Sequence, residues 1–256
     1  MHRIYLKNIN NMLNVIYFDE LDSTNAHLKL NILEYNHGDC IVANHQTAGR
    51  GQLGTAWVSK PHENVMCSFL IEWSKVKVAD QFQISKLVAI VVLSEIKALL
   101  PDHEVKIKWP NDIYVDDYKV AGILIENTVQ HAYIDKSIIG IGINVNQTEF
   151  PNFNGKKVSS IKNIINDNKE INIYELIKNI GNDIIQEVEF GRIHDSKTLN
   201  RVYLNHLLGY REDRPFIDKD GEFIGCIKGI DALGRLMIED QKRLKTYDLK
   251  EIKFIF

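Results

Sequence analysis

The chain has 256 residues, a formal net charge of −3 at pH 7, 45% hydrophobic residues and 25% charged residues. These values are ordinary for a soluble globular protein, and the length suits one large domain or a domain of about 200 residues with a smaller one. The near-neutral charge excludes a general polyanion-binding surface, so any basic site must be local.

Strands are predicted in the first part of the chain wherever short apolar or alternating runs occur, at 15–18, 40–43, 65–73, 105–109, 113–115, 120–125 and 138–145. Asp22-Ser-Thr-Asn25 opens a helix, with Asp22 or Ser23 as the N-cap. Asp80 and Gln83 form a capping-box pattern ahead of a longer helix that Pro101 closes. Further helices are predicted at 173–190 and 196–208.

After Gly209 the sequence pattern changes from helices and long strands to short apolar runs separated by turn residues. Short strands are predicted at 215–217, 223–230, 236–239 and 246–252. Asp220-Gly221 and Leu233-Gly234 supply turns between them. A barrel of about 45 residues is marginal alone, so we expect it to dock on the main domain.

The sequence shows no paired cysteines, no signal peptide and no membrane span, and these three observations bear on compartment and redox state. Cys40, Cys67 and Cys226 lie far apart and form no C-x-x-C pair, which indicates reduced thiols rather than a secreted disulfide scaffold. Residues 1–12 lack the apolar core of a signal peptide, and the run 87–93 is far shorter than the ~20 residues of a membrane span. The sequence predicts a cytoplasmic protein.

Gly49-Arg-Gly-Gln-Leu-Gly54 matches the dinucleotide fingerprint G-x-G-x-x-G, but its context does not. The fingerprint requires a helix to begin at the glycines, whereas residues 55–64 carry a proline and no helical period. We therefore expect a flexible loop whose backbone can approach a ligand. Arg50 can bind a phosphate or carboxylate, and Trp57 can close over a purine or apolar ring. An exposed surface turn is the equally open alternative.

The run Lys108-Trp-Pro-Asn-Asp112, with Lys119 after a predicted hairpin, carries the densest polar chemistry of the chain. Pro110 restricts its neighbours, so that Asn111 and Asp112 are held at a strand end. Asp112 suits Mg²⁺, and the two lysines suit negative charge on a phosphoryl group. The alternative is an exposed turn with a solvated salt bridge, with Trp109 filling the core.

Gly140-Ile-Gly-Ile-Asn-Val-Asn146 places its glycines and asparagines on one strand face, since side chains alternate with a period of two. Glycine weakens a strand unless something approaches that face, so Asn144 is a candidate amide contact to a ligand. Close packing of both glycines against a helix is the alternative. The histidines show no metal spacing and no G-x-S-x-G elbow occurs, which disfavours a zinc hydrolase or a triad enzyme.

Together these motifs resemble the biotin–protein ligases (holocarboxylase synthetases) from about Val15 to the C-terminus. The resemblance rests on the ordered segments Asp22–Asn25, Gln46–Trp57, Lys108–Asp112, Lys119–Glu126 and Gly140–Asn144. It implies an α+β fold, in which an extension at 1–12 precedes a mixed-sheet, biotin/lipoate-ligase-like catalytic domain at 13–208. A small SH3-like β-barrel at 209–256 would follow.

The resemblance implies a two-step reaction. Biotin and Mg-ATP give biotinyl-5′-AMP and pyrophosphate, and a lysine of a biotin carboxyl carrier domain then takes the biotinyl group and releases AMP. The loop at 49–57 would be the lid that keeps water from the intermediate. Nearby Lys119 and Lys108 would lower the pKa of the acceptor amine by repulsion, and Asp112 is the candidate to accept its proton.

Site residues follow from the family positions. The resemblance assigns biotin binding to Ser23, Thr24, Asn25, Gln46, Arg50, Gly51, Gln52 and Lys119. It assigns ATP or adenylate binding to Arg50, Trp57, Lys108, Asn111, Asp112 and Asn144, and catalysis to Lys119, Arg50, Asp112 and Lys108. Asp112 would be the Mg²⁺ ligand. The family often has arginine where this chain has Gln52, so we expect a weaker electrostatic hold on the adenylate phosphate.

Partners are also implied. About a dozen residues precede the first predicted strand, too few for a winged helix-turn-helix, so we expect no specific DNA binding. No membrane partner is expected, and family members occur as monomers and as homodimers. A lipoate/octanoate–protein ligase and a non-catalytic biotin-binding module remain the alternative functions.

Overall fold

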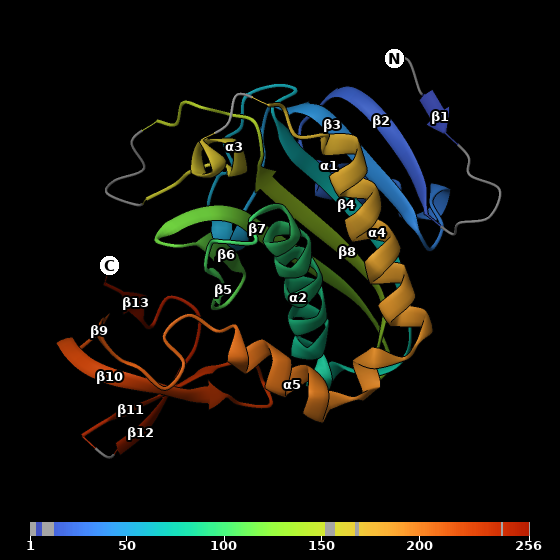
Figure 1. The fold of residues 1–256 in the computed structure, drawn as a ribbon. Coiled ribbons are helices and arrows are strands. Elements are labelled where there is room, and N and C mark those ends of the chain that lie inside the picture. The colour runs from blue at the N-terminus through green and yellow to red at the C-terminus, as the bar shows by residue number, and fades with distance from the viewer. Residues whose placement is uncertain (1–3, 7–12, 152–156, 167–168, 242, 256) are drawn as a thin grey trace.

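The computed structural model describes residues 4–6, 13–151, 157–166, 169–241 and 243–255. Its strands form an eight-stranded sheet in the order β1-β2-β3-β4-β8-β7-β6-β5 and a five-stranded sheet in the order β12-β11-β10-β9-β13. Helices pack against the larger sheet, and the smaller sheet lies beside its β5 edge (Figure 1).

The larger sheet is mixed, as predicted. Its strands are β1 (Ile4–Leu6), β2 (Asn14–Leu21), β3 (Asp39–Gln46), β4 (Asn64–Lys77), β5 (Val105–Lys108), β6 (Asp112–Val115), β7 (Tyr118–Gln130) and β8 (Tyr133–Asn144). Among the described strands only β2 and β3 pair in parallel. The strands from β5 to β8 follow one another through short turns, which require antiparallel pairing.

Helices cover both faces of this sheet, and each face buries an apolar cluster. On one face α1 (Thr24–Leu30) packs Leu28 among Phe18 and Leu70. On the other face lie the long helices of the chain, α2 (Phe82–Leu99), α4 (Ile173–Glu189) and α5 (Ser196–Asn205). The short α3 (Ile161–Ile165) begins at the N-cap Ser160, which accepts a bond from Asn163 N. Two covered faces explain why β4 and β8 are apolar along most of their length.

The smaller sheet docks on the larger domain, as predicted. It consists of β9 (Asp213–Asp218), β10 (Gly221–Ile230), β11 (Leu236–Asp240), β12 (Arg243–Tyr247) and β13 (Lys253–Phe254), all antiparallel and consistent with a small barrel. Trp109 donates its indole N–H to the carbonyl of Gly234 at 2.8 Å. Phe82 packs so closely on Gly234 that a Cβ there would lie 2.5 Å from its ring. The turn around Gly234 is therefore one of the contacts between the smaller sheet and the larger domain.

The structure corrects parts of the secondary-structure prediction. A strand at β1, the helix α3 and several 3₁₀ turns were not predicted. The strand expected at 246–252 ends at Tyr247, because Asp248 and Glu251 close a turn through Glu251 N to Asp248 O at 3.1 Å.

Helix starts were predicted with mixed success. Ser23 caps α1, with its hydroxyl 3.5 Å from Ala26 N. The capping box at Asp80 and Gln83 is wrong: a 3₁₀ turn at Val78–Asp80 precedes α2, whose N-cap is Gln81 with no side-chain bond. The expectation that no α-helix begins at the glycine loop is confirmed, since a 3₁₀ turn at Gln52–Gly54 leads towards β4.

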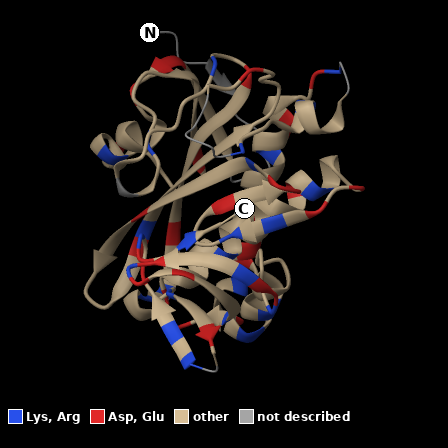
Figure 2. Cartoon of the chain, turned by 90° about the vertical axis from the view of Figure 1, so that its left-hand side faces the viewer, with Lys and Arg blue, Asp and Glu red and all other residues tan. Residues whose placement is uncertain are grey.

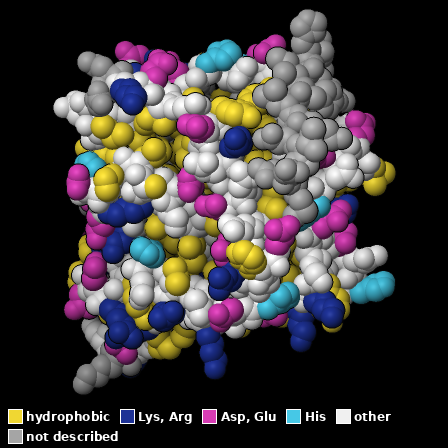
Figure 3. Space-filling view, turned by 45° about the vertical axis from the view of Figure 1, so that its right-hand side comes forward, with side chains coloured by type: hydrophobic (Ala, Val, Ile, Leu, Met, Phe, Trp, Pro, Cys, Tyr) yellow, Lys and Arg dark blue, Asp and Glu magenta, His cyan; other side chains and the backbone are white. Residues whose placement is uncertain are grey.

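The surface agrees with the near-neutral net charge. Lysines and arginines alternate with acidic residues over the chain in Figure 2, and apolar side chains are interspersed with charged ones on the face shown in Figure 3. Within the described residues no helix is long and apolar enough to cross a membrane.

Candidate active site

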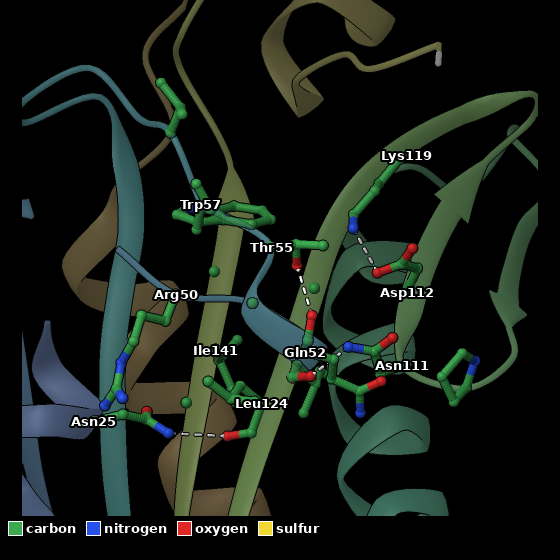
Figure 4. Close-up of a pocket in the computed structure, with 18 of the residues that line it drawn as sticks. Asn25, Arg50, Gln52, Thr55, Trp57, Asn111, Asp112, Lys119, Leu124 and Ile141 are labelled. Atoms are coloured by element: carbon green, nitrogen blue, oxygen red, sulfur yellow. Dashed lines mark hydrogen bonds and ion pairs between the residues drawn. The ribbon is translucent and has the colours of Figure 1, made fainter. Parts of the chain in front are cut away.

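A cavity of about 570 Å³ opens over the larger sheet, beside α1 and under the glycine loop. Every site residue predicted from the sequence lines it: Ser23, Thr24, Asn25, Gln46, Arg50, Gly51, Gln52, Trp57, Lys108, Asn111, Asp112, Lys119 and Asn144. Figure 4 shows Asn25 and Arg50 at one end and Lys119 and Asp112 at the other. This volume lies within the usual range of small-ligand pockets.

One end of the cavity is a buried hydrogen-bond network between α1 and three strands. Gln46 accepts bonds from the Thr24 backbone N–H at 2.8 Å and from its hydroxyl at 3.2 Å. Ser68 Oγ lies 2.7 Å from Thr24 Oγ1 and 2.6 Å from Asn25 Oδ1. Ser68 is fully buried, and it had no predicted role. The network fixes the polar groups of α1 that face the cavity.

Glu126 on β7 continues this network towards the loop. Its Oε2 accepts from Asn25 Nδ2 at 3.0 Å and lies 3.9 Å from Arg50 Nη2, while Oε1 accepts from Lys29 Nζ at 2.9 Å. Burial raises the pKa of Glu126, but hydrogen bonds from Lys29 and Asn25 and the charges of Lys29 and Arg50 outweigh it, leaving the pKa below its usual range. Glu126 is therefore a carboxylate at neutral pH.

The glycine loop folds back across the cavity. Gly51 N donates to Thr55 O at 2.6 Å, and Trp57 N donates to Gly49 O at 2.9 Å. The Trp57 indole lies on the strand face at Gly142, where a Cβ would be 2.5 Å from the ring. A loop side chain rather than a helix therefore packs on Gly142, which also lines the cavity, and the approach of a ligand to this face stays a prediction.

Gly140 is packed in the same way. A Cβ at this position would lie 2.1 Å from Asn25 Oδ1, so only glycine admits the α1 side chain here. Asn144 donates its amide to the Ser159 carbonyl at 3.1 Å and is buried. Although it lines the cavity, its amide N–H therefore holds the segment after β8, and its contact with a ligand stays a prediction.

The opposite end of the cavity is charged. Lys119 Nζ lies 2.5 Å from Asp112 Oδ1, so the predicted hairpin does bring the second lysine back beside the carboxylate. Their strands pair directly, with Asp112 opposite Gly122 and an irregularity at Ile113/Tyr114 that shifts the register before Lys119. Both side chains are largely buried, which strengthens their attraction.

Lys108 lies on β5 directly opposite Asp112 on β6. Its ammonium group is 4.8 Å from the centre of the Phe254 ring on β13 and 6.0 Å from that of Tyr114. Trp109 is 3% exposed, which confirms the core-filling reading of this residue. Asn111 donates its amide to the Ile123 carbonyl at 2.7 Å, which ties the turn to β7.

Residues without a predicted role also line the cavity. Leu249 and Lys250 reach it from the smaller sheet, and Phe150 and Val158 come from the segment after β8. A serine inside the apolar run of β4 was the only sequence signal for Ser68. Leu249 and Lys250 carried none, because the docking of the smaller sheet brings them there.

The cavity fits a magnesium ion only when a substrate brings further ligands. Among the described residues no group of three His, Cys, Asp or Glu side chains lies close enough together to hold a metal. Asp112 is a single carboxylate at the cavity wall. One carboxylate with substrate phosphates is a common arrangement for Mg²⁺, so the donor set suits a substrate-bound ion and not a resident one.

The chain is similar to known ligases. The model of the Biotin/lipoate A/B protein ligase family matches residues 15–144, about half of the chain. The bifunctional ligase/repressor BirA of Salmonella typhimurium is 37% identical over 52% of this chain and 41% of that protein. BirA of Bacillus spizizenii is 29% identical over 90% of this chain and 71% of that protein. The chain thus matches about two fifths of the length of the enterobacterial relatives.

Solved structures share the whole architecture. Biotin protein ligase from Aquifex aeolicus in complex with biotin and ATP superposes with a TM-score of 0.73 at 26% identity, over 96% of this chain and 98% of that one. A Leishmania major ligase with biotinyl-5-AMP, at 20% identity and a TM-score of 0.60, shares the fold. This chain therefore belongs to the Biotin/lipoate A/B protein ligase family.

Proposed function

We propose that the protein is an ATP-dependent biotin–protein ligase. One observation carries this function: a single cavity joins the buried polar network at Thr24, Asn25 and Gln46 to the Lys119–Asp112 pair, and Arg50 of the loop lies at the end that holds the network. A ligand with a polar ring at one end and a carboxylate at the other matches this distribution. The relative from Aquifex aeolicus binds biotin and ATP within the same fold.

The first step would join the biotin carboxylate to the α-phosphate of ATP and release pyrophosphate. Thr24, Asn25 and Gln46 would hold the ureido ring, with the Gln46 amide as donor to its carbonyl. Lys119 would lie at the reacting carboxylate and phosphate, where its charge stabilises the negative charge that develops. Asp112 would hold a Mg²⁺ ion shared with the phosphates, and this ion supplies further positive charge when bound.

The loop would protect the product of that step. A mixed anhydride of a carboxylate and a phosphate hydrolyses unless water is kept away. Trp57 already covers Gly142, and the same indole would close over the adenine. Gln52 lies in the 3₁₀ turn of the loop and carries no charge. Arg50 would therefore be the only cation that the loop at 49–57 supplies to the phosphate. We expect Gln52→Arg to slow dissociation of the adenylate.

The second step would transfer biotin to a lysine of a carrier domain, with release of AMP. Relatives from Mycobacterium tuberculosis and Paracoccus denitrificans are biotin–[acetyl-CoA-carboxylase] ligases, which supports a biotin carboxyl carrier domain as acceptor. Lys119 would favour the neutral form of the attacking amine by repulsion, and Asp112 would accept its proton. An unchanged pH–rate profile of transfer in Asp112→Asn would remove Asp112 from that role.

The division of the chain is part of the proposal. Residues 13–208 would form the catalytic domain and 209–256 a small SH3-like barrel. The five antiparallel strands β9 to β13 support the second unit, and Leu249 and Lys250 would make it a wall of the ATP site.

The deciding experiment is biotin-dependent exchange of labelled pyrophosphate into ATP, with lipoate and octanoate in parallel reactions. We expect exchange with biotin alone. Exchange with lipoate or octanoate but not biotin would transfer the proposal to those acids. No exchange with any acid, in folded protein supplied with magnesium, would leave a binding module and contradict the ligase.

A further inference from the structure

We propose that Glu126 is a positioning residue that holds Arg50 of the loop over the cavity and fixes Asn25 beneath it. One carboxylate thereby connects the loop over the cavity with the wall of its proposed biotin end. The part of this inference that concerns biotin rests on the proposed function, whereas the part that concerns the loop does not.

The contact with Asn25 fixes the orientation of an amide. An ionised carboxylate only accepts hydrogen bonds, so Glu126 Oε2 at 3.0 Å requires the NH₂ group of Asn25 on its side. The Leu124 carbonyl, 3.3 Å from the same nitrogen, requires the same orientation. Asn25 Oδ1 must then point to Ser68 and to the surface of Gly140, as observed. Without Glu126 the amide loses its charged acceptor.

The contact with Arg50 is of another kind. Arg50 Nη2 lies 3.9 Å from Glu126 Oε2, and the two side chains are 47% and 25% exposed. A long, half-exposed ion pair is weak, because water screens it. It is strong enough to bias the loop towards the closed position, yet an anionic ligand can replace Glu126 as the partner of Arg50. We expect this exchange when a carboxylate or phosphate enters the cavity.

Lys29 pairs with Glu126 independently of the loop. Its ammonium group lies 2.9 Å from Oε1, on the other oxygen of the same carboxylate, and it comes from α1 rather than the loop. Lys29 therefore offers a matched control. Its removal takes a cation from Glu126 but leaves the Arg50 contact in place.

Limited trypsin digestion of the ligand-free protein tests the loop contact, since the Arg50–Gly51 bond is itself a cleavage site. Loss of an exposed ion pair should raise the fraction of molecules whose glycine loop is open by about two- to five-fold. We expect Glu126→Gln and Glu126→Ala to be cut there two- to five-fold faster than wild type, at a temperature well below the melting temperature of every variant. Lys29→Gln should be cut no faster. Wild-type cleavage rates in both Glu126 variants, or equal acceleration in Lys29→Gln, would overturn the proposal.

Biotin titration by calorimetry tests the contact with Asn25. Glu126→Gln keeps an oxygen that can accept from Asn25, so its biotin dissociation constant should rise less than that of Glu126→Ala, for which we expect about a fivefold increase or more. Equal, wild-type-like binding in both variants would refute the role at Asn25. If wild type itself binds no biotin, the proposed function fails, and the digestion still decides whether Glu126 holds the loop.

Discussion

Substitution of Ser68 by alanine should weaken biotin binding through Thr24 and Asn25, the two proposed biotin-binding residues that its hydroxyl contacts. Its hydroxyl lies 2.7 Å from Thr24 Oγ1 and 2.6 Å from Asn25 Oδ1. Ser68 is fully buried, so water cannot replace these bonds. A buried polar group left without its partner costs about 1–3 kcal/mol. Part of this cost falls on folding and part on the alignment of the pocket wall.

Ser137→Ala is the matched control, because Ser137 is an equally buried serine of the same sheet. Ser137 accepts from Trp73 Nε1 at 2.7 Å and donates to Asn127 Oδ1 at 2.6 Å, and it does not line the cavity. Both variants should therefore lose a similar 1–3 kcal/mol of unfolding free energy in urea, by the same estimate of about one unmet buried partner.

Calorimetry with biotin then separates the two serines. We expect the dissociation constant to rise about five- to thirtyfold in Ser68→Ala, which corresponds to about 1–2 kcal/mol, and to stay unchanged in Ser137→Ala. If Ser68→Ala loses stability but binds biotin as wild type does, the network supports the fold and not the site. Equal loss of affinity in both variants would point to a general loosening of the sheet.

Three further changes test the charge and packing arguments. Lys119→Met should lower biotin-dependent pyrophosphate exchange by about a hundredfold or more, because Asp112 then faces the phosphate without its cation; an unchanged rate would remove Lys119 from catalysis. Gly142→Val should displace the Trp57 indole and raise the KM for ATP without changing biotin affinity, measured by exchange kinetics and calorimetry. Burial lowers the pKa of Lys86 to about 8, below its usual 10.5, so the unfolded chain binds more protons between these values and wild-type stability rises with pH across that window. The free energy of unfolding of Lys86→Met, measured in urea relative to wild type, should therefore be more favourable to the variant at pH 7 than at pH 10; a difference that is constant with pH would contradict the buried charge.

Local sequence determined those parts of the site that lie close together along the chain. Asp112 and Lys119 are separated by one short hairpin, so strand periodicity and a polar turn were enough to predict that they meet. The cap at Ser23 followed from a side chain that bonds the backbone three residues later. The same holds for the glycine loop, whose proline and missing helical period excluded an α-helix.

Only the tertiary structure decided what depends on the packing of distant segments. Ser68 and Glu126 come from two strands and had no predicted role, because only the packing of those strands brings both of them to Asn25. Lys108 lines the cavity as predicted, but its sequence pattern gave no sign that the docked smaller sheet would bring Phe254 against its ammonium group. Periodicity tells which face of an element is buried, whereas the partner that buries it is set by how the elements pack, because side chains far apart in the sequence must fill one shared volume.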